Sequence, residues 1–298
     1  MTAEPPFPAK HRASRAGLAA PFLVVAVAFC FQTGSALATR VIAAVGIVDA
    51  LWLRTAIAAV ILVAVRPRSL RLPPKGRRRP IALLTLSLLA MNLSFYGAIS
   101  YAPLGIVVAI EFLGPLAVAV IGMRRKLDFL WIGLALAGVV LLAGPTSSVS
   151  GLGLGLSLVA ACSWGTFVVL AKRAVSIMPP LHVTTLMLTG SALLLTPALA
   201  AWGPRMVHHP SAVPLGVAVS VLSSALPYFV ELIALRLVRA ATYGVLLSLE
   251  PAVAALMGFL VAGQSLALLE IGAILAVMVA AAGASWTSRP RPTGLEIG

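Results

Sequence analysis

The sequence is poor in charge. Only 10% of its 298 residues are charged, and only eight are Asp or Glu, while 60% are apolar. A soluble domain carries about 25% charged residues, so this chain has too few to cover the surface of a water-soluble globule. Intrinsic disorder is excluded because it requires low hydrophobicity. Since a spanning helix uses about 20 apolar residues, the composition predicts a polytopic all-α membrane protein with short loops.

Cysteine and clusters of metal-binding residues are also scarce. Cys30 and Cys162 are the only cysteines, and both lie inside apolar runs, where cysteine usually serves as a small packing residue. His208 and His209 stand in a polar connection without further ligand residues nearby. The sequence has neither a phosphate-binding loop nor a Ser/His/Asp arrangement. We therefore expect no metal, no cofactor and no enzymatic activity.

Apolar runs separated by Pro, Gly and charged residues predict ten membrane spans. The predicted spans are 17–38, 46–65, 81–101, 104–122, 129–144, 151–171, 181–202, 213–235, 240–260 and 267–286. The first follows a basic tail and ends in Ala36-Leu37-Ala38, which also resembles a signal-peptide cleavage site. Its length, and its match to a later span, favour a first span that is retained.

The net charge of +14 raises the question of a nucleic-acid partner. The Lys and Arg residues, however, fall in the breaks between spans. If the N-terminus is inside, 19 of the 22 lie in the two tails and the loops of that side, and seven of these are in 66–80. Arg40 and Arg205 fall on the other side, and Arg54 lies within a span. This positive-inside pattern predicts an even number of spans, two cytoplasmic termini and no nucleic-acid partner.

The two halves of the chain align with each other. Pro115–Gly122 matches Pro251–Gly258 at an offset of 136, and Phe31–Arg40 matches Trp164–Arg173 at an offset of 133. Each half holds five spans, so the second half enters the membrane from the opposite side. Such five-plus-five inverted repeats are typical of secondary transporters, whose binding sites lie between the repeats. The predicted organisation is a cytoplasmic tail at 1–16, repeats at 17–144 and 151–287, and a second tail at 288–298.

A pair of small-residue motifs recurs in the fifth and tenth spans. Gly133 and Ala137 match Gly272 and Ala276 at an offset of 139, and each pair has the Gly-x-x-x-Ala spacing. Small residues at this spacing let helix backbones approach closely. The motifs predict close helix packing rather than chemistry.

Ionisable residues within the spans are the first candidates for function. Each costs about 2.5–3.5 kcal/mol on the insertion scale, so each needs a reason to be there. The four charged residues within the predicted spans, away from the span ends, are Arg54, Glu111, Glu231 and Glu250. Of these, Glu231 lies on the same helix face as Tyr228, three positions earlier.

Glu111 and Glu250 occupy the repeat-related fourth and ninth spans. Glu111 precedes Pro115 by four residues, and Glu250 directly precedes Pro251. A proline within a helix frees a carbonyl about one turn back and bends the helix. Broken helices beside carboxylates near the middle of the membrane are expected of a site for a polar solute.

Further polar and aromatic candidates lie near these residues in the sequence. Asn92 and Tyr96 fall one helical turn apart in the third span, Tyr228 aligns with Asn92 across the repeat, and Trp164 aligns with Phe31. We take Asn92, Tyr96, Trp164 and Tyr228 as candidate substrate-binding residues. Packing or anchoring at the membrane interface is the alternative for the aromatic rings.

Three stretches resemble a known family. They are PLGIVVAIEFLGP at 103–115, ALPYFVELIALR at 225–236 and TYGVLLSLEPA at 242–252. Together they resemble the EamA branch of the drug/metabolite transporter superfamily, and within it the threonine and homoserine exporters of the bacterial inner membrane. The resemblance implies ten spans in two inverted repeats. It also implies efflux of small polar metabolites, such as these amino acids, driven by the proton gradient. An exporter of other metabolites or drugs and an uncoupled facilitator of the same fold are the alternatives.

The resemblance suggests how such a transporter would work. Glu111 or Glu250 would hold the ammonium group of an amino acid, and Arg54 its carboxylate if it faces the cavity. Arg54 would otherwise neutralise one of the buried glutamates. A carboxyl that binds either a proton or the substrate makes the two compete, and that competition gives antiport. Glu250 is the first candidate for this shared group and Glu111 the second.

Overall fold

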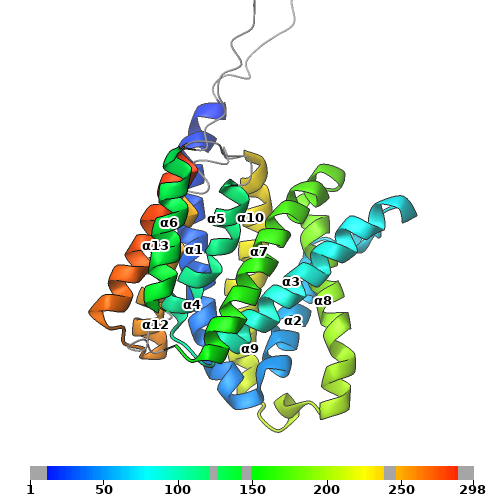
Figure 1. The fold of residues 1–298 in the computed structure, drawn as a ribbon. Coiled ribbons are helices and arrows are strands. Elements are labelled where there is room, and N and C mark those ends of the chain that lie inside the picture. The colour runs from blue at the N-terminus through cyan, green and yellow to red at the C-terminus, as the bar shows by residue number, and fades with distance from the viewer. Residues whose placement is uncertain (1–11, 121–125, 143–148, 238–245, 288–298) are drawn as a thin grey trace, which may run out of the picture.

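The computed structural model describes residues 12–120, 126–142, 149–237 and 246–287. Within these ranges the chain forms helices and turns and contains no strand, which confirms the all-helical prediction (Figure 1). The helices are α1 (Arg12–Val45), α2 (Ile47–Val65), α3 (Arg78–Ala98), α4 (Leu104–Glu111), α5 (Leu113–Val120), α6 (Lys126–Leu142), α7 (Gly151–Ile177), α8 (Pro180–Trp202), α9 (Ala212–Ser220), the π-helical segment η4 (Val221–Ala225), α10 (Leu226–Leu237), α12 (Glu250–Ala262) and α13 (Leu268–Thr287).

Six helical stretches in the described residues are long and apolar enough to cross a membrane. They are Val24–Val45, Ile47–Val65, Arg78–Ala98, Gly151–Ile177, Pro180–Trp202 and Ala212–Ile233. Four shorter apolar helices accompany them, at Leu104–Val118, Phe129–Leu142, Glu250–Ala262 and Leu268–Ala284. A chain with this many long apolar helices is a multi-pass membrane protein. The count of ten crossings stays a prediction.

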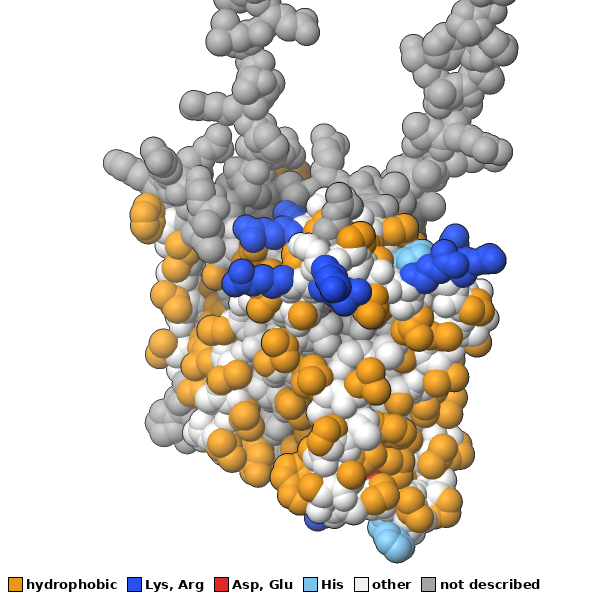
Figure 2. Space-filling model, turned by 90° about the vertical axis from the view of Figure 1, so that its right-hand side faces the viewer, with side chains coloured by type: hydrophobic (Ala, Val, Ile, Leu, Met, Phe, Trp, Pro, Cys, Tyr) orange, Lys and Arg blue, Asp and Glu red, His pale blue; other side chains and the backbone are white. Residues whose placement is uncertain are grey.

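Most of the described Lys and Arg side chains lie toward one end of the bundle, whereas Arg40 and Arg205 lie near the opposite end, where α1 ends. The first turn of α1 and the last turn of α13 lie at the same end (Figure 1). In Figure 2, Lys and Arg side chains form a belt near that end, above a wide hydrophobic surface. The connection between α2 and α3, together with the first turn of α3, supplies six exposed basic side chains: Arg66, Arg68, Arg71, Lys75, Arg78 and Arg79. This distribution is the one that the positive-inside rule describes.

The predicted span boundaries differ from the helix ends most clearly in α1. The helix begins at Arg12, within the predicted tail 1–16, and continues to Val45, beyond the predicted end at residue 38. It ends where Gly46 adopts a φ of +83°, a conformation that side chains disfavour. Arg40 is therefore not in a loop. Its Nη2 donates to the carbonyl of Val261 at 2.7 Å, near the C-terminal end of α12, where a cation is favourable. Residues 1–11 and 288–298 of the predicted tails lie outside the described residues.

Helices from the two predicted halves pack against each other in matching pairs. α1 packs against α12, and α7 packs against α4 and α5. α3 packs against α7, and α1 packs against α9, η4 and α10. α2 packs against α8, α4 against α12, and α6 against α13. If each helix is replaced by the helix at the equivalent position of the other half, every contact in this set becomes another contact of the set. A twofold axis between the halves would have this effect.

Close helix contacts form at glycines other than those in the predicted motifs. Gly133 and Gly272 have open space where a Cβ would stand, so the prediction that the Gly-x-x-x-Ala motifs mediate close packing is wrong. The contact between α6 and α13 forms instead at Gly138, where a Cβ would come within 2.9 Å of the Ala273 carbonyl oxygen. The spacing marks small residues, but in helices that are apolar on every side it does not reveal which face meets a neighbour.

Candidate functional site

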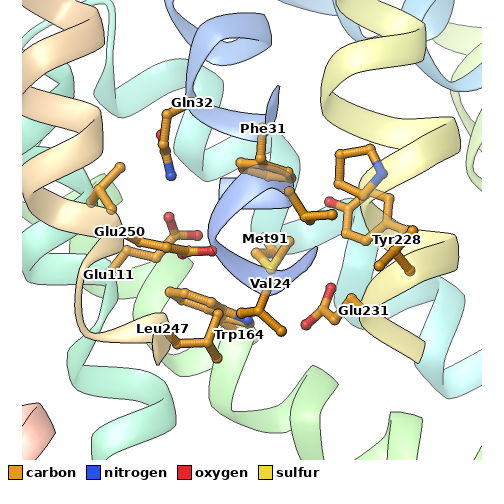
Figure 3. A pocket seen from close by; sticks show the side chains of 14 residues that line it. Val24, Phe31, Gln32, Met91, Glu111, Trp164, Tyr228, Glu231, Leu247 and Glu250 are labelled. Carbon is orange, nitrogen blue, oxygen red and sulfur yellow. The ribbon is translucent and has the colours of Figure 1, made fainter. Parts of the chain in front are cut away.

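A cavity lies within the bundle between α1, α3, α4, α7, α10 and α12 (Figure 3). It offers about 50 Å³ to water-sized molecules. A single buried water needs about 10–15 Å³, so the cavity accommodates a few waters or a small polar group. Half of its 14 lining residues are Val, Leu, Met or Pro, and the other seven are polar or aromatic: Phe31, Gln32, Glu111, Trp164, Tyr228, Glu231 and Glu250.

Glu111 reaches the cavity from the end of α4. It is the last residue of that helix and is 7% exposed. Pro115 has no N–H to donate to the Glu111 carbonyl, and α4 gives way to α5 between these two residues. The bend brings Gly114 so close to α7 that a Cβ on Gly114 would collide with the Ala161 carbonyl. The carboxyl is therefore held where two short helices join and pack tightly on a third.

Glu250 reaches the cavity from the start of α12. It is the first residue of this helix, and Pro251 follows in the first turn, where the missing N–H of proline is harmless. The carboxyl thus lies at the partially positive end of the helix. In Figure 3, Glu250 and Glu111 point into the same part of the cavity. One carboxyl comes from each predicted repeat.

Trp164, Tyr228 and Glu231 complete the polar and aromatic lining. The Trp164 ring meets Phe112 edge-to-face at 5.4 Å between centroids, and the Tyr228 ring meets Phe31 in the same way at 6.0 Å. Glu231 follows Tyr228 on α10 and lies on the side of the cavity away from Glu250 (Figure 3). Such aromatic pairs hold their rings in defined orientations, so these walls are fixed by packing.

Arg54 is fully buried but does not line the cavity. Its Nε donates to Ser224 Oγ at 2.6 Å and its Nη2 to the Ser223 carbonyl at 2.6 Å. Pro227, four residues after Ser223, has no N–H with which to bond that carbonyl, so the guanidinium takes the place of the missing helical donor. The local backbone is the π-helical segment η4. Arg54 thus binds α2 to the irregular part of the α9–η4–α10 helix.

Aromatic rings surround the Arg54 guanidinium. It lies 5.3 Å from the centroid of Tyr96, 5.5 Å from that of Phe31 and 5.9 Å from that of Tyr228, within the range of cation–π attraction. Its Nη1 has no hydrogen-bond partner among the described residues. Phe31 and Tyr228 line the cavity and Arg54 does not, so these rings contact both the guanidinium and the cavity.

Asn92 and Tyr96 also lie behind the cavity wall. Both are buried, at 3% and 0% exposed, and neither lines the cavity. Asn92 Nδ2 donates to the Leu88 carbonyl at 2.9 Å. The Tyr228 hydroxyl lies 3.2 Å from Asn92 Nδ2 and 3.3 Å from its Oδ1. Of the eight predicted binding residues, the structure brings Glu111, Trp164, Tyr228, Glu231 and Glu250 to the cavity, and it places Arg54, Asn92 and Tyr96 behind them.

The sequence reasoning missed Gln32 and Met91, which line the cavity from α1 and α3. It also used Phe31 only as the repeat partner of Trp164. A primary amide inside an apolar run was the available signal for Gln32. Met91 gave no signal, because a methionine in an apolar span is normally a packing residue.

The cavity has an unbalanced charge pattern. Among the described residues that line the cavity, three are glutamates, and there is no Lys, Arg or His. The described residues contain no group of His, Cys, Asp and Glu suited to holding a metal ion. The carboxyl oxygens instead suit protons and ammonium groups.

Comparison with known proteins gives consistent results. Residues 151–286 match the model of the EamA-like transporter family. The threonine/homoserine exporter RhtA of Salmonella typhimurium strain LT2 is 38% identical over 277 residues, covering 91% of this chain and 93% of that protein. RhtA of Escherichia coli K12 is 37% identical over 274 residues, covering 90% and 92%. One solved crystal structure shares the fold, with a TM-score of 0.66 at 18% identity over 90% of this chain and 97% of the other.

The helices and their cavity, together with these relatives, define a multi-pass membrane transporter. This class agrees with the expectation of a transporter rather than an enzyme. The chain belongs to the EamA-like transporter family.

Proposed function

We propose that this chain exports small amino acids such as threonine and homoserine across the bacterial inner membrane, in exchange for protons. The observation that carries the proposal is the cavity in which Glu111 and Glu250 point into the same space with no basic side chain in the described lining. The similarity to threonine/homoserine exporters over nine-tenths of the chain supports the class of substrate.

The proposal includes ten spans arranged as two inverted repeats, with both termini in the cytoplasm. The matching helix contacts of the two halves support it. So does the common position of the α1 start and the α13 end, which lie at the basic end of the bundle (Figures 1 and 2). The cavity then lies between the repeats, which is the usual location of the site in transporters of this plan.

In the proposed mechanism the substrate ammonium binds between Glu111 and Glu250. An ammonium has three donors, and two carboxyls can accept from it at once. A proton bound to either carboxyl removes an acceptor charge, so protons and substrate compete for the same groups. Release of substrate on one side and of protons on the other then couples the two fluxes. Glu250 is the first candidate for the shared group and Glu111 the second.

Arg54 has a different part in this mechanism from the one the sequence suggested. Its guanidinium donates to Ser223 and Ser224 and lies behind the Phe31 and Tyr228 rings. We therefore assign it to positioning the α9–η4–α10 helix and the aromatic wall, and not to binding the substrate carboxylate in the conformation described.

The test uses the purified protein in vesicles with an acidic interior. Proton antiport predicts that these vesicles accumulate labelled threonine, and that a protonophore abolishes the accumulation. Glu250→Gln should lose the accumulation. Glu270→Gln is the matched control, since Glu270 accepts from the Ala267 N–H at the start of α13 and does not line the cavity. Undiminished proton-driven flux in Glu250→Gln would remove Glu250 from this role. If threonine only reaches equal concentrations inside and outside the vesicles, whether or not a pH gradient is present, the protein is an uncoupled facilitator.

A further inference from the structure

Gln32 of α1 is a buried amide without a partner. The residue is 1% exposed, it lines the cavity, and its Oε1 has no hydrogen-bond partner. No described residue accepts from its Nε2 within hydrogen-bond distance. In Figure 3 the side chain extends into the cavity on the side of Glu250. A primary amide has two donors and an acceptor oxygen with two lone pairs, so this side chain brings unused hydrogen-bonding capacity to the cavity wall.

An unpaired buried amide is unusual because it has lost its hydrogen bonds to water without replacing them. Gln32 is also held firmly in this position. The next residue, Thr33, donates to Met257 Sδ at 3.2 Å, which joins α1 to α12. Gly34 lies so close to η4 that a Cβ would stand 2.8 Å from the Ser223 Cβ. The backbone of α1 therefore cannot easily turn the amide toward another partner.

Two other neutral side chains of the described lining carry polar atoms, Trp164 and Tyr228. Trp164 offers only an indole N–H donor, and the Tyr228 hydroxyl is already engaged. The Tyr228 hydroxyl is within hydrogen-bond distance of Asn92 and lies 3.5 Å from Arg54 Nη2. Glu111 and Glu250 suit an ammonium. Gln32 thus offers both a donor and an acceptor to a neutral polar group of a bound solute, next to the carboxyls.

We propose that Gln32 is a specificity residue that recognises the side-chain hydroxyl of the exported amino acid. This inference rests on the proposed function and adds how the site selects among amino acids. A hydroxyl donates one hydrogen bond and accepts others, as the amide requires. An apolar side chain of equal size would leave the amide unpaired, and sites built to bond a hydroxyl discriminate against substrates that lack one.

The test compares substrates matched in shape. Threonine is compared with valine, and homoserine with norvaline, in vesicles containing either wild type or Gln32→Leu. The hydroxyl preference of the wild type should fall about tenfold in Gln32→Leu, as loss of one buried hydrogen bond predicts. Met91→Leu is the control. It changes another cavity-lining side chain at nearly constant volume and should leave the preference unchanged. Equal losses for threonine and valine in Gln32→Leu would overturn the proposal.

Thermal stability separates recognition from a structural role. If Gln32 serves the substrate, Gln32→Leu without substrate should melt in detergent at the wild-type temperature or above it, because an unpaired amide is replaced by an apolar group. A lower melting temperature would assign Gln32 to structure and overturn the proposal. A wild type that moves neither threonine nor valine would overturn the exporter function itself. A wild type that moves both without preference would overturn only the assignment of Gln32.

Discussion

The Asn92 amide and the Tyr228 hydroxyl are hydrogen-bonded, with the hydroxyl 3.2 Å from Nδ2 and 3.3 Å from Oδ1. The two residues occupy equivalent positions of the two predicted halves, 136 residues apart. Residues related by a twofold axis touch each other only near that axis. The pair therefore marks where an axis between the halves would pass, beside the cavity.

The Asn92–Tyr228 pair should be energetically coupled. Tyr228→Phe removes one partner of Asn92, which keeps its bond to the Leu88 carbonyl, and Asn92→Leu removes one partner of Tyr228, which stays 3.5 Å from Arg54 Nη2. The double variant removes both groups. We expect a coupling energy of about 1 kcal/mol in the free energy of unfolding. Unfolding in mixed micelles would measure it by a double-mutant cycle. Tyr101→Phe, at an exposed tyrosine, should be neutral. A coupling energy near zero would contradict the bond.

Arg54 and Pro227 should show a stronger non-additivity. Arg54→Met leaves the Ser223 carbonyl without its donor, and we expect a loss of about 2–3 kcal/mol. Pro227→Ala supplies a backbone N–H that can bond the same carbonyl, so it should restore part of that stability. The melting temperature of the double variant in detergent should exceed that of Arg54→Met.

The comparison also depends on the wild-type background. In the wild type the Ser223 carbonyl already has a donor. Pro227→Ala should therefore raise the melting temperature less in the wild type than in the Arg54→Met variant. Equal gains in the two backgrounds would mean that the guanidinium does not replace the missing helical donor.

Gly34 should not tolerate even a methyl group. A Cβ there would lie 2.8 Å from the Ser223 Cβ and 2.9 Å from its backbone nitrogen, so Gly34→Ala must push α1 away from η4. We expect a loss of about 1–3 kcal/mol and a reduced threonine flux. Gly155→Ala in α7 is the control, because nothing lies within 4 Å of its Cβ position; it should be neutral or stabilising. Similar melting temperatures for the two variants would argue against the close contact.

The proposed topology can be tested by labelling. In a background without Cys30 and Cys162, single cysteines would replace the exposed residues Lys75 and His208. With cytoplasmic termini, a membrane-impermeant maleimide applied to intact cells should label position 208 and not position 75. Both should react after permeabilisation. Labelling of position 75 in intact cells would show that the orientation is the opposite of the proposed one.

The sequence predicted the helical class and several cavity residues because buried charge is conspicuous in an apolar chain. Glu111, Glu231 and Glu250 stand out for this reason, and all three line the cavity. Arg54 stood out equally, yet it lies behind the wall. α2 is apolar on nearly every side, so no periodicity indicates which way a given side chain faces.

Contacts that depend on backbone detail were beyond the reach of sequence patterns. The link between Arg54 and the Ser223 carbonyl exists because Pro227 frees that carbonyl and η4 widens locally. The repeat drew attention to Pro115 and Pro251, whereas Pro227 had no marked partner. Gln32 was missed because an amide in a span costs less than a charge and gives a weaker signal.

The tie between Arg54 and η4 has a mechanical consequence. In an ordinary helix the backbone hydrogen bonds are made within the helix itself, so a neighbouring helix can slide past it without breaking them. Here part of the internal bonding of one helix is supplied by a side chain from α2. Ser220 Oγ in turn donates to the Arg54 carbonyl at 2.8 Å. If transport requires a rocking motion of the helices between two conformations, α2 and the α9–η4–α10 helix must move together as one rigid unit. The hinges of that motion must then lie in other parts of the chain.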